Sequence, residues 1–175
     1  KLKVSNEDLE DLNRRLNNTR LPDQPPIEAW KTGTDITWFK KLLNYWKNDY
    51  DWKKSEEELN TFDQFKININ DIDVHFIKSE GKGKNNIPLL LLHGWPGSVF
   101  EFLEIIKILN DPNAFGIDTN FSFTLVAPSL PGFGLSFKAN QKRVGVEEIA
   151  DMLLLMMNKL GYSKFLIQGG DWGSM

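Results

Sequence analysis

The clearest chemistry in the sequence lies in the run Gly-Gly-Asp-Trp-Gly at residues 169–173. A short apolar stretch at residues 165–167 leads into it, which predicts a strand that ends in a tight turn. In an elbow of the type Gly-x-nucleophile-x-Gly, the flanking glycines let the backbone bend sharply and expose the central side chain. The pattern therefore predicts a nucleophile at Asp171, with Gly169 and Gly173 shaping the turn.

A carboxylate nucleophile limits the possible reactions. Its attack on an acyl carbon would give a mixed anhydride, which is a poor intermediate, whereas its attack on a saturated carbon gives an alkyl ester that water can cleave. Epoxides and haloalkanes fit this chemistry because they carry a strained ring or a good leaving group; esters and peptides fit it less well. Taken alone, the motif is equally compatible with a Gly-rich turn that carries a surface aspartate.

Two further motifs follow predicted strands. The run His-Gly-Trp-Pro-Gly at 93–97 comes after the apolar stretch 88–92, and Pro-Ser-Leu-Pro-Gly-Phe-Gly-Leu-Ser at 128–136 comes after the stretch 123–127. Open α/β sheets place their sites at the carboxyl ends of parallel strands. We therefore expect both motifs to lie beside the elbow at one edge of a sheet.

The segments between these motifs have a helical pattern. Ser98 and Glu101 form a capping box at the start of one helix, and residues 146–160 form a second helix that Gly161 ends. Strands and helices thus alternate along the chain, which predicts a largely parallel sheet with right-handed crossovers.

A β-hairpin is expected before the first of these strands. Apolar and polar residues alternate from Phe65 to Phe76 around the turn signal Asn70-Asp71. The pattern predicts one buried face, with His75 in the polar phase at a surface or sheet edge.

Residues 1–63 form a region of different character, helical and rich in charge and tryptophan. Ser5 and Asp35 are placed to cap two helices, and a third short helix is expected near Trp52–Leu59. The tryptophans here are interpreted as packing residues. The chain therefore divides into a helical region, 1–63, and an α/β region, 64–175.

Composition excludes several classes of protein. The 175 residues carry a net charge of −3 without a long basic run, which argues against nucleic acid as a partner. The absence of cysteine excludes disulfides and thiolate metal sites. No apolar run spans a bilayer and no signal peptide is visible, which favours a cytoplasmic protein. Because the chain begins at Lys1 and ends just past the elbow, we expect it to be a fragment of a longer protein. The sequence leaves open whether that longer protein has a membrane anchor.

With these motifs in this order, the sequence resembles the epoxide hydrolases of the α/β-hydrolase superfamily, closest to the microsomal, juvenile hormone and bacterial group. Leu-Leu-His-Gly-Trp-Pro-Gly-Ser at 91–98, the segment 127–136 and Gln-Gly-Gly-Asp-Trp-Gly-Ser at 168–174 are similar to that group's three site motifs. The leader is similar as well, for instance Arg-Leu-Pro-Asp at 20–23. The resemblance covers nearly the whole chain and implies an α/β-hydrolase fold, truncated after the elbow and preceded by a helical region.

The resemblance assigns roles to individual residues. Asp171 would open the epoxide to form an ester, and the backbone N–H groups of Trp95 and Trp172 would form the oxyanion hole. Water would then release a vicinal diol without a cofactor or metal. His93 is implied to hold its loop rather than to act as a base. The other residues implied to shape the motifs are Gly94, Pro96, Gly132, Gly134, Gly169 and Gly173.

The resemblance also indicates which parts of the machinery lie elsewhere. In the family, the histidine and acid that activate water, and two lid tyrosines, follow the elbow beyond Met175. We therefore expect that residues 1–175 alone do not turn over substrate. The expected partners are a small apolar epoxide of lipid, terpenoid or xenobiotic type and water; the oligomeric state stays open. Alternatives are a haloalkane dehalogenase, another α/β-hydrolase, or a truncated, non-catalytic fragment that binds a partner.

Overall fold

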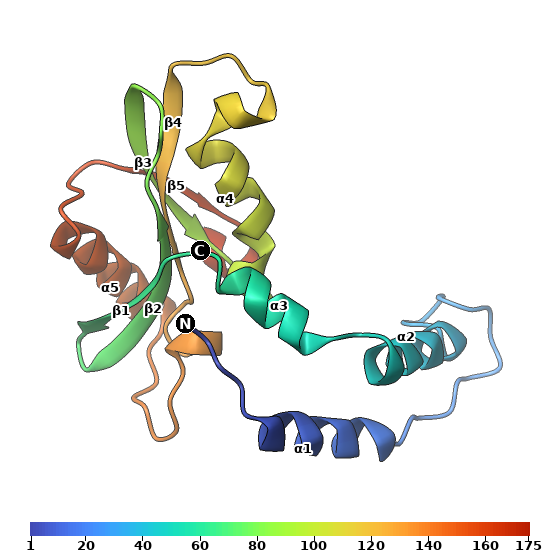
Figure 1. The fold of residues 1–175 in the computed structure, drawn as a ribbon. Helices are drawn as coiled ribbons and strands as arrows, with labels where there is room; N and C mark the ends of the chain where they lie inside the picture. The colour runs from blue at the N-terminus through green and yellow to red at the C-terminus, as the bar shows by residue number, and fades with distance from the viewer. The chain divides into compact units, whose positions relative to one another are not determined.

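The computed structural model describes all residues from 1 to 175 (Figure 1). The fold divides into two compact units, a helical unit of residues 2–58 and an α/β unit of residues 59–175 that also includes Lys1. The sequence pattern predicts a boundary after residue 63, whereas contacts between residues place the division after residue 58.

Three helices make up the helical unit: α1 (Asn6–Asn17), α2 (Ile36–Asn48) and α3 (Trp52–Leu59), the last residue of which belongs to the α/β unit. The Asp8 N–H donates to Ser5 Oγ at 3.0 Å, and the Trp38 N–H donates to Asp35 Oδ1 at 2.8 Å. These bonds satisfy backbone donors that the first helical turn leaves unpaired. The three expected helices and both expected caps are confirmed.

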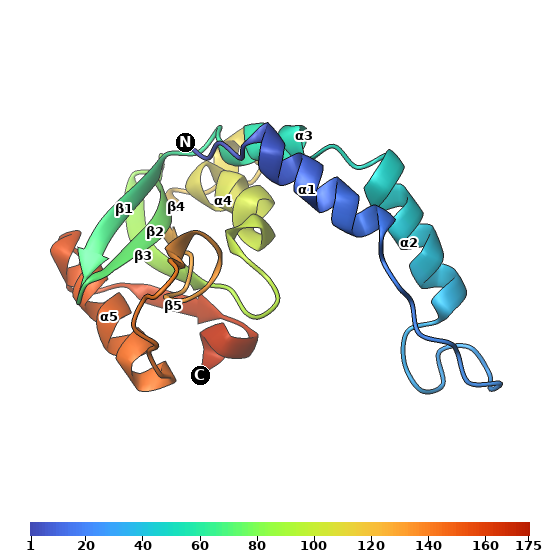
Figure 2. The ribbon, with the colours of Figure 1, turned by 90° about the horizontal axis from the view of Figure 1, so that it is seen from below.

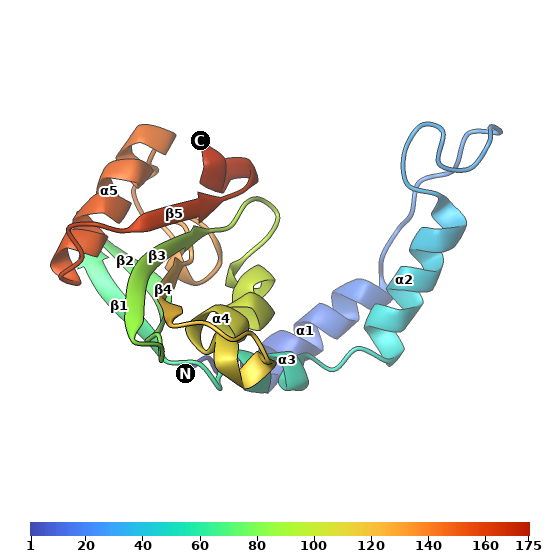
Figure 3. The ribbon, with the colours of Figure 1, turned by 90° about the horizontal axis from the view of Figure 1, so that it is seen from above.

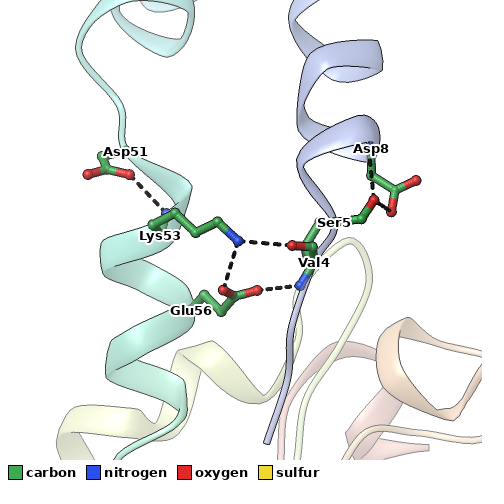
Figure 4. A network of polar contacts seen from close by, with 6 residues as sticks. All are labelled: Val4, Ser5, Asp8, Asp51, Lys53 and Glu56. Carbon is green, nitrogen blue, oxygen red and sulfur yellow. Dashed lines mark hydrogen bonds and ion pairs between the residues drawn. The ribbon is translucent and has the colours of Figure 1, made fainter.

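A polar network ties the segment before α1 to α3, as Figure 4 shows. The Glu56 carboxylate accepts the Val4 N–H, and the Lys53 ammonium donates to Glu56 Oε1 at 3.1 Å and to the Val4 carbonyl at 2.9 Å. The bond from the Val4 N–H holds the pKa of Glu56 below its usual value, against the effect of desolvation. Local sequence pattern does not indicate this network, because it joins residues about fifty positions apart in the chain.

An apolar groove of about 590 Å³ lies among the three helices. Aromatic side chains of α2 line part of it and are exposed, including Tyr45 and Trp46, at 52% and 44%. Leucines of α1, among them Leu9, Leu12 and Leu16, line the other side. None of the three sequence motifs that could carry chemistry lines this groove.

The α/β unit is built on a mixed five-stranded sheet with the strand order β1-β2-β4-β3-β5. The strands β3, β4 and β5 run parallel, whereas β2 is antiparallel to both of its neighbours, β1 and β4. The expected parallel arrangement thus holds for the strands that precede the motifs. The bounds are β1 (Gln64–Ile69), β2 (Ile72–Ser79), β3 (Asn85–Leu92), β4 (Phe121–Pro128) and β5 (Leu166–Gly169).

Helices cover the two faces of this sheet, with α4 (Leu103–Asn110) on one side and α5 (Val146–Lys159) on the other (Figures 2 and 3). A 3-10 turn, η1 (Val99–Phe102), leads into α4 and begins with the expected capping box, in which Ser98 N–H donates to Glu101 Oε1 at 3.1 Å. A second 3-10 turn, η2 (Pro112–Phe115), lies between α4 and β4.

The main core lies between α5 and one face of the sheet. Met152, Leu153, Met156 and Met157 of α5 are all at most 4% exposed. The helical spacing predicts Leu153 and Met156 on the inner face. Met152 and Met157 are buried beside them, so the face of α5 that packs against the sheet is wider than the helical spacing indicates.

The hairpin forms as expected, and Lys66, Asn68 and Asp73 of its polar phase are exposed, but His75 of the same phase is buried. Asn70 and Asp71 make the turn with φ angles of 49° and 64°, the left-handed conformation that two-residue hairpin turns require. The prediction that His75 lies at a surface or edge is wrong, since its side chain is only 4% exposed. The strand β2 lies inside the sheet, and Ser129 and Ser136 pack against His75.

The opposite edge of the sheet is formed by β5, which Figure 3 shows beside β3. Two of its side chains, Leu166 and Ile167, are 52% and 57% exposed. Among the helices, none combines the length and the apolar content needed to cross a bilayer.

Candidate active site

The three motifs come together at the carboxyl edge of the parallel strands. Residues 93–97 follow β3, residues 129–136 follow β4, and residues 170–174 follow β5. In the sheet, β3 lies between the other two, and Leu92 at its end is opposite Gly169 of β5. The convergence expected from the order of strands and motifs is therefore present.

The turn after β5 has the geometry of a tight elbow. Asp171 has a φ of 53°, in the left-handed region that residues with a side chain rarely adopt. The backbone then enters a 3-10 turn, η4 (Asp171–Ser174), in which the Gly173 N–H donates to the Gly170 carbonyl at 2.9 Å. The turn is tight enough that a Cβ on Gly169 would lie 2.0 Å from the Gly173 carbonyl oxygen, so only glycine fits there.

The side chain of Asp171 reaches across to the segment after β3. Its Oδ1 accepts the Trp95 N–H at 2.8 Å. The close approach explains Gly94, because a Cβ on that residue would lie 2.5 Å from the Asp171 Cβ. The backbone N–H groups of Trp95 and, to a smaller extent, of Trp172 lower the pKa of Asp171, because each stabilises the ionised carboxylate.

His93 lies behind this contact and is 1% exposed. Its Nε2 accepts the Leu130 N–H at 3.0 Å, and its Nδ1 lies 2.9 Å from the Gly94 carbonyl oxygen. A backbone N–H can only donate, so Nε2 carries no proton and Nδ1 is the donor to Gly94. Both ring nitrogens are therefore occupied in one neutral tautomer. The ring also packs edge-on against Phe133, with 5.8 Å between ring centroids.

Residues 128–136 form a compact loop at the rim of the sheet, which we call the rim loop. It ends in a 3-10 turn, η3 (Gly134–Ser136), and its two glycines, Gly132 and Gly134, have positive φ angles of 90° and 43°. Ser129 and Ser136 are each 1% exposed, and Ser136 Oγ donates to the Ser129 carbonyl at 2.7 Å. In the segment after β3, the Trp95–Pro96 peptide bond is cis.

His75 belongs to the same region, although the sequence pattern did not indicate it. Its Nδ1 lies 3.0 Å from Ser129 Oγ, its Nε2 lies 3.1 Å from Gln64 Oε1, and its backbone N–H donates to Ser136 Oγ at 2.9 Å. Burial lowers the pKa of His75 to about 4, with a smaller contribution from the positive charge of Lys66. The signal that could have revealed it is a titratable residue between buried apolar positions in β2.

The groups available for chemistry around Asp171 are its carboxylate, backbone N–H donors and indole rings. Trp95 and Trp172 are 67% and 45% exposed beside the carboxylate. The chain has two histidines, and both have their ring nitrogens in buried contacts, so neither offers a basic nitrogen to a water molecule at Asp171. No group of three or more His, Cys, Asp or Glu side chains could hold a metal ion.

Two protein families match this chain. The family described as "Epoxide hydrolase N terminus" matches residues 1–102, and the family described as "alpha/beta hydrolase fold" matches residues 87–175. The overlap falls on β3 and the segment that contains Trp95.

Proteins with similar sequences are named as epoxide hydrolases. The chain is 39% identical over 181 residues to epoxide hydrolase 1 of Oryctolagus cuniculus, and 36% identical over 180 residues to juvenile hormone epoxide hydrolase 1 of Ctenocephalides felis. Both alignments cover 100% of this chain but only 39% and 38% of those proteins.

Solved structures give the same result. The juvenile hormone epoxide hydrolase of Bombyx mori superposes with a TM-score of 0.84 at 37% identity, over 99% of this chain and 46% of that one. The epoxide hydrolase of Aspergillus niger superposes with a TM-score of 0.85 at 30% identity, again over 99% and 46%. The chain thus spans less than half the length of the proteins that it resembles.

Proposed function

Because this chain belongs to the epoxide hydrolase family and has the α/β-hydrolase fold, we propose that the full-length protein hydrolyses an epoxide to a vicinal diol through an ester of Asp171. The observation that carries the proposal is the contact between Asp171 Oδ1 and the Trp95 N–H at 2.8 Å. It combines an exposed carboxylate, whose pKa is lowered, with a backbone donor aimed at it.

In the first step, the ionised carboxylate attacks one carbon of the epoxide ring. A bond forms between a carboxylate oxygen and that carbon, the ring C–O bond breaks, and its electron pair goes to the epoxide oxygen, which takes up a proton from a donor outside residues 1–175. The lowered pKa of Asp171 keeps the carboxylate ionised at neutral pH, as nucleophilic attack requires. The exposed indoles of Trp95 and Trp172 favour an apolar substrate at this position.

In the second step, water attacks the carbonyl carbon of the ester. Negative charge develops on the carbonyl oxygen, and the N–H groups of Trp95 and Trp172 stabilise it as an oxyanion hole. The acyl–oxygen bond then breaks, the departing oxygen takes up the proton that the attacking water has given to the base, and the diol leaves as the carboxylate is restored. Loss of one oxyanion donor typically lowers the rate by a factor of about 10²–10³. The two donors should therefore account for a large part of the rate enhancement of the second step.

The remaining motif residues are proposed to shape the site rather than to react. His93 holds the loop after β3, while Gly94, Pro96, Gly132, Gly134, Gly169 and Gly173 give the turns their form. The base that activates water comes from outside these 175 residues, because the contacts of His75 and His93 occupy their ring nitrogens. We accordingly expect no turnover by residues 1–175 alone.

Single turnover of the full-length protein in oxygen-18 water tests this proposal. Water attacks the ester carbonyl, so the oxygen released in the first diol comes from Asp171 and carries no label. Diol that is fully labelled in the first turnover would mean direct attack of water on the epoxide and would reject the ester. Halide release from haloalkanes, without diol formation from any epoxide in a panel, would instead identify a dehalogenase.

A further inference from the structure

One peptide group joins His93 to the nucleophile. The Gly94 carbonyl accepts the proton of His93 Nδ1 at 2.9 Å, and the N–H at the other end of the same peptide group, that of Trp95, donates to Asp171 Oδ1 at 2.8 Å. A peptide group is planar, so its carbonyl and its N–H turn together. The bond from His93 therefore also fixes the direction of the Trp95 N–H.

This restraint is needed because of Gly94. A glycine beside a peptide group leaves that group more freedom to rotate than any other residue would, and the contact with Asp171 excludes a side chain at Gly94. Trp95 itself is 67% exposed, so packing of its side chain does little to hold the backbone. The orientation of the donor thus depends on the ring of His93.

The ring of His93 is in turn held by the rim loop. Leu130 donates its backbone N–H to Nε2 at 3.0 Å, and Phe133 packs against the ring. Both contacts come from residues 128–136, so the position of the ring follows the position of that loop.

A buried polar cluster anchors the rim loop to the hairpin. Ser136 Oγ accepts the His75 N–H at 2.9 Å and donates to the Ser129 carbonyl at 2.7 Å. The Ser129 N–H donates to the His75 carbonyl at 2.9 Å, and Ser129 Oγ lies 3.0 Å from His75 Nδ1. Gln64 completes the cluster: its Nε2 donates to the Leu59 carbonyl and to Asn60 Oδ1, which leaves Oε1 as the acceptor for His75 Nε2–H.

We infer that His75, Ser129 and Ser136 are positioning residues for the oxyanion hole, which act through the rim loop and His93 on the peptide group between Gly94 and Trp95. They differ from catalytic residues in that their contacts run between the hairpin and the rim loop. The inference rests on the proposed function, because it concerns the oxyanion donor of that reaction.

The two chemical steps depend differently on this donor. The second step builds negative charge on the oxygen that the Trp95 N–H faces, so a displaced donor slows it. The first step removes charge from the carboxylate, so a weaker donor leaves the nucleophile at least as reactive. A displaced peptide group should therefore slow hydrolysis of the ester more than its formation, whereas a general loss of folded protein lowers both to the same extent.

The decisive experiment measures both steps in single turnover of the full-length protein. Quenched mass spectrometry follows the Asp171 adduct in the unmodified enzyme and in Ser136→Ala. In the variant, hydrolysis is expected to slow by about tenfold, a fraction of the loss caused by removal of a donor, while ester formation changes by less than about twofold. The adduct should therefore accumulate. Ser136→Thr, which restores a hydroxyl, should recover most of the hydrolysis rate.

Two further variants keep the test informative. Ser122→Ala is the matched control. Ser122 is as buried as Ser136, and its Oγ also accepts a backbone N–H, that of Gly83, at 2.8 Å. Ser122 lies near the beginning of β4, however, whereas the rim loop follows the end of that strand. It should leave the ratio of the two rates unchanged. If Ser136→Ala does not fold, Ser129→Ala replaces it, since that change removes the hydroxyl beside His75 Nδ1 and keeps the backbone bonds.

The outcomes separate the inference from the proposed function. Equal slowing of both steps, or an unchanged ratio in Ser136→Ala and Ser129→Ala, overturns the positioning role alone. The same shift of the ratio in Ser122→Ala would also overturn it. Absence of any Asp171 adduct in the unmodified enzyme overturns the proposed function and this inference with it.

Discussion

At the scale of single residues, the chemistry depends on the carboxylate of Asp171. Replacement by asparagine removes the negative charge and the nucleophilic oxygen but keeps the size of the side chain. For Asp171→Asn in the full-length protein, we expect diol formation to fall on the order of 10⁴–10⁶-fold, as for removal of other covalent nucleophiles. Stopped single-turnover assays measure the rate, and an unchanged thermal unfolding curve serves as the control. Diol formation within tenfold of the unmodified protein would contradict the ester mechanism.

A second prediction concerns the space between the two motifs. In Gly94→Ala, the new Cβ would lie 2.5 Å from the Asp171 Cβ and 2.7 Å from its Oδ1, so the carboxylate and the Trp95 N–H must move apart. We expect diol formation to fall by about 10² or more, the loss that follows removal of one oxyanion donor.

The matched control for this variant is Gly145→Ala. Gly145 has a φ of −85° and nothing within 4 Å of an added Cβ, so activity should stay within about twofold of the unmodified protein. Similar activities for the two alanine variants would mean that the close approach at Gly94 does not restrict the site.

A third prediction at this scale follows from the buried His75. Its pKa is lowered from 6.5 to about 4 in the folded protein by burial. Between these two pH values the unfolded chain binds a proton that the folded chain does not, so the free energy of unfolding falls as the pH is lowered through this window. At pH 5 the loss amounts to about 2 kcal/mol relative to pH 7.5.

Urea unfolding of the full-length protein at pH 7.5 and pH 5 measures this loss. The variant His75→Asn cannot titrate in this window, so the difference between the two pH values should shrink in it, even though the variant is less stable at both. An equal pH-dependent loss in the two proteins would show that another group is responsible.

The candidate site could be predicted from sequence only in part. The three motifs and their common edge follow from the order of strands, and the close approach at Gly169 agrees with the need for glycine in an elbow. The contact of His75 with the rim loop could not be predicted, because Ser129 and Ser136 lie 54 and 61 positions further along the chain. Alternation shows which residues share a face of a strand, but burial depends on what packs against that face.

At the scale of elements, local signals determine where helices begin. Ser5 and Asp35 each bond a backbone N–H three residues later, and such short-range contacts can be predicted without the tertiary structure. The extent of the core is harder to predict. Met152 and Met157 are buried because the sheet contacts a wide face of α5, which the spacing of the helix does not reveal.

The two ends of α2 provide a matched pair of substitutions. Asp35 accepts the Trp38 N–H at the N-terminus, whereas Asp49 follows the last turn, where a negative charge faces the negative end of the helix dipole. We expect Asp35→Ala to lower the free energy of unfolding by about 1 kcal/mol and Asp49→Ala to leave it unchanged or raise it by about 0.5 kcal/mol. Chemical denaturation of the full-length protein measures both. Equal effects of the two substitutions would mean that the cap at Asp35 contributes nothing specific.

At the scale of the whole molecule, each unit exposes apolar surface. The helical unit does so along the aromatic face of α2, and the α/β unit does so along β5. The relatives named above extend well beyond the part that aligns here, since the alignments cover 39% and 38% of their lengths. Tests of activity therefore belong to the full-length protein, whereas the behaviour of these exposed surfaces can be measured on residues 1–175.

The edge strand β5 gives the last prediction. Its outer edge carries unpaired backbone groups, and Leu166 and Ile167 are 52% and 57% exposed, a combination that promotes pairing between strands of different molecules. Residues 1–175 should therefore associate as concentration rises, and Ile167→Lys should reduce this association, because a charged side chain on an edge strand opposes edge-to-edge pairing. Light scattering across a concentration series measures it. The matched control is Ile105→Lys, since Ile105 is 40% exposed but lies on the helix α4 and not on a strand. If both lysine variants reduce association equally, exposed apolar area in general drives it; if neither does, β5 is not the surface involved.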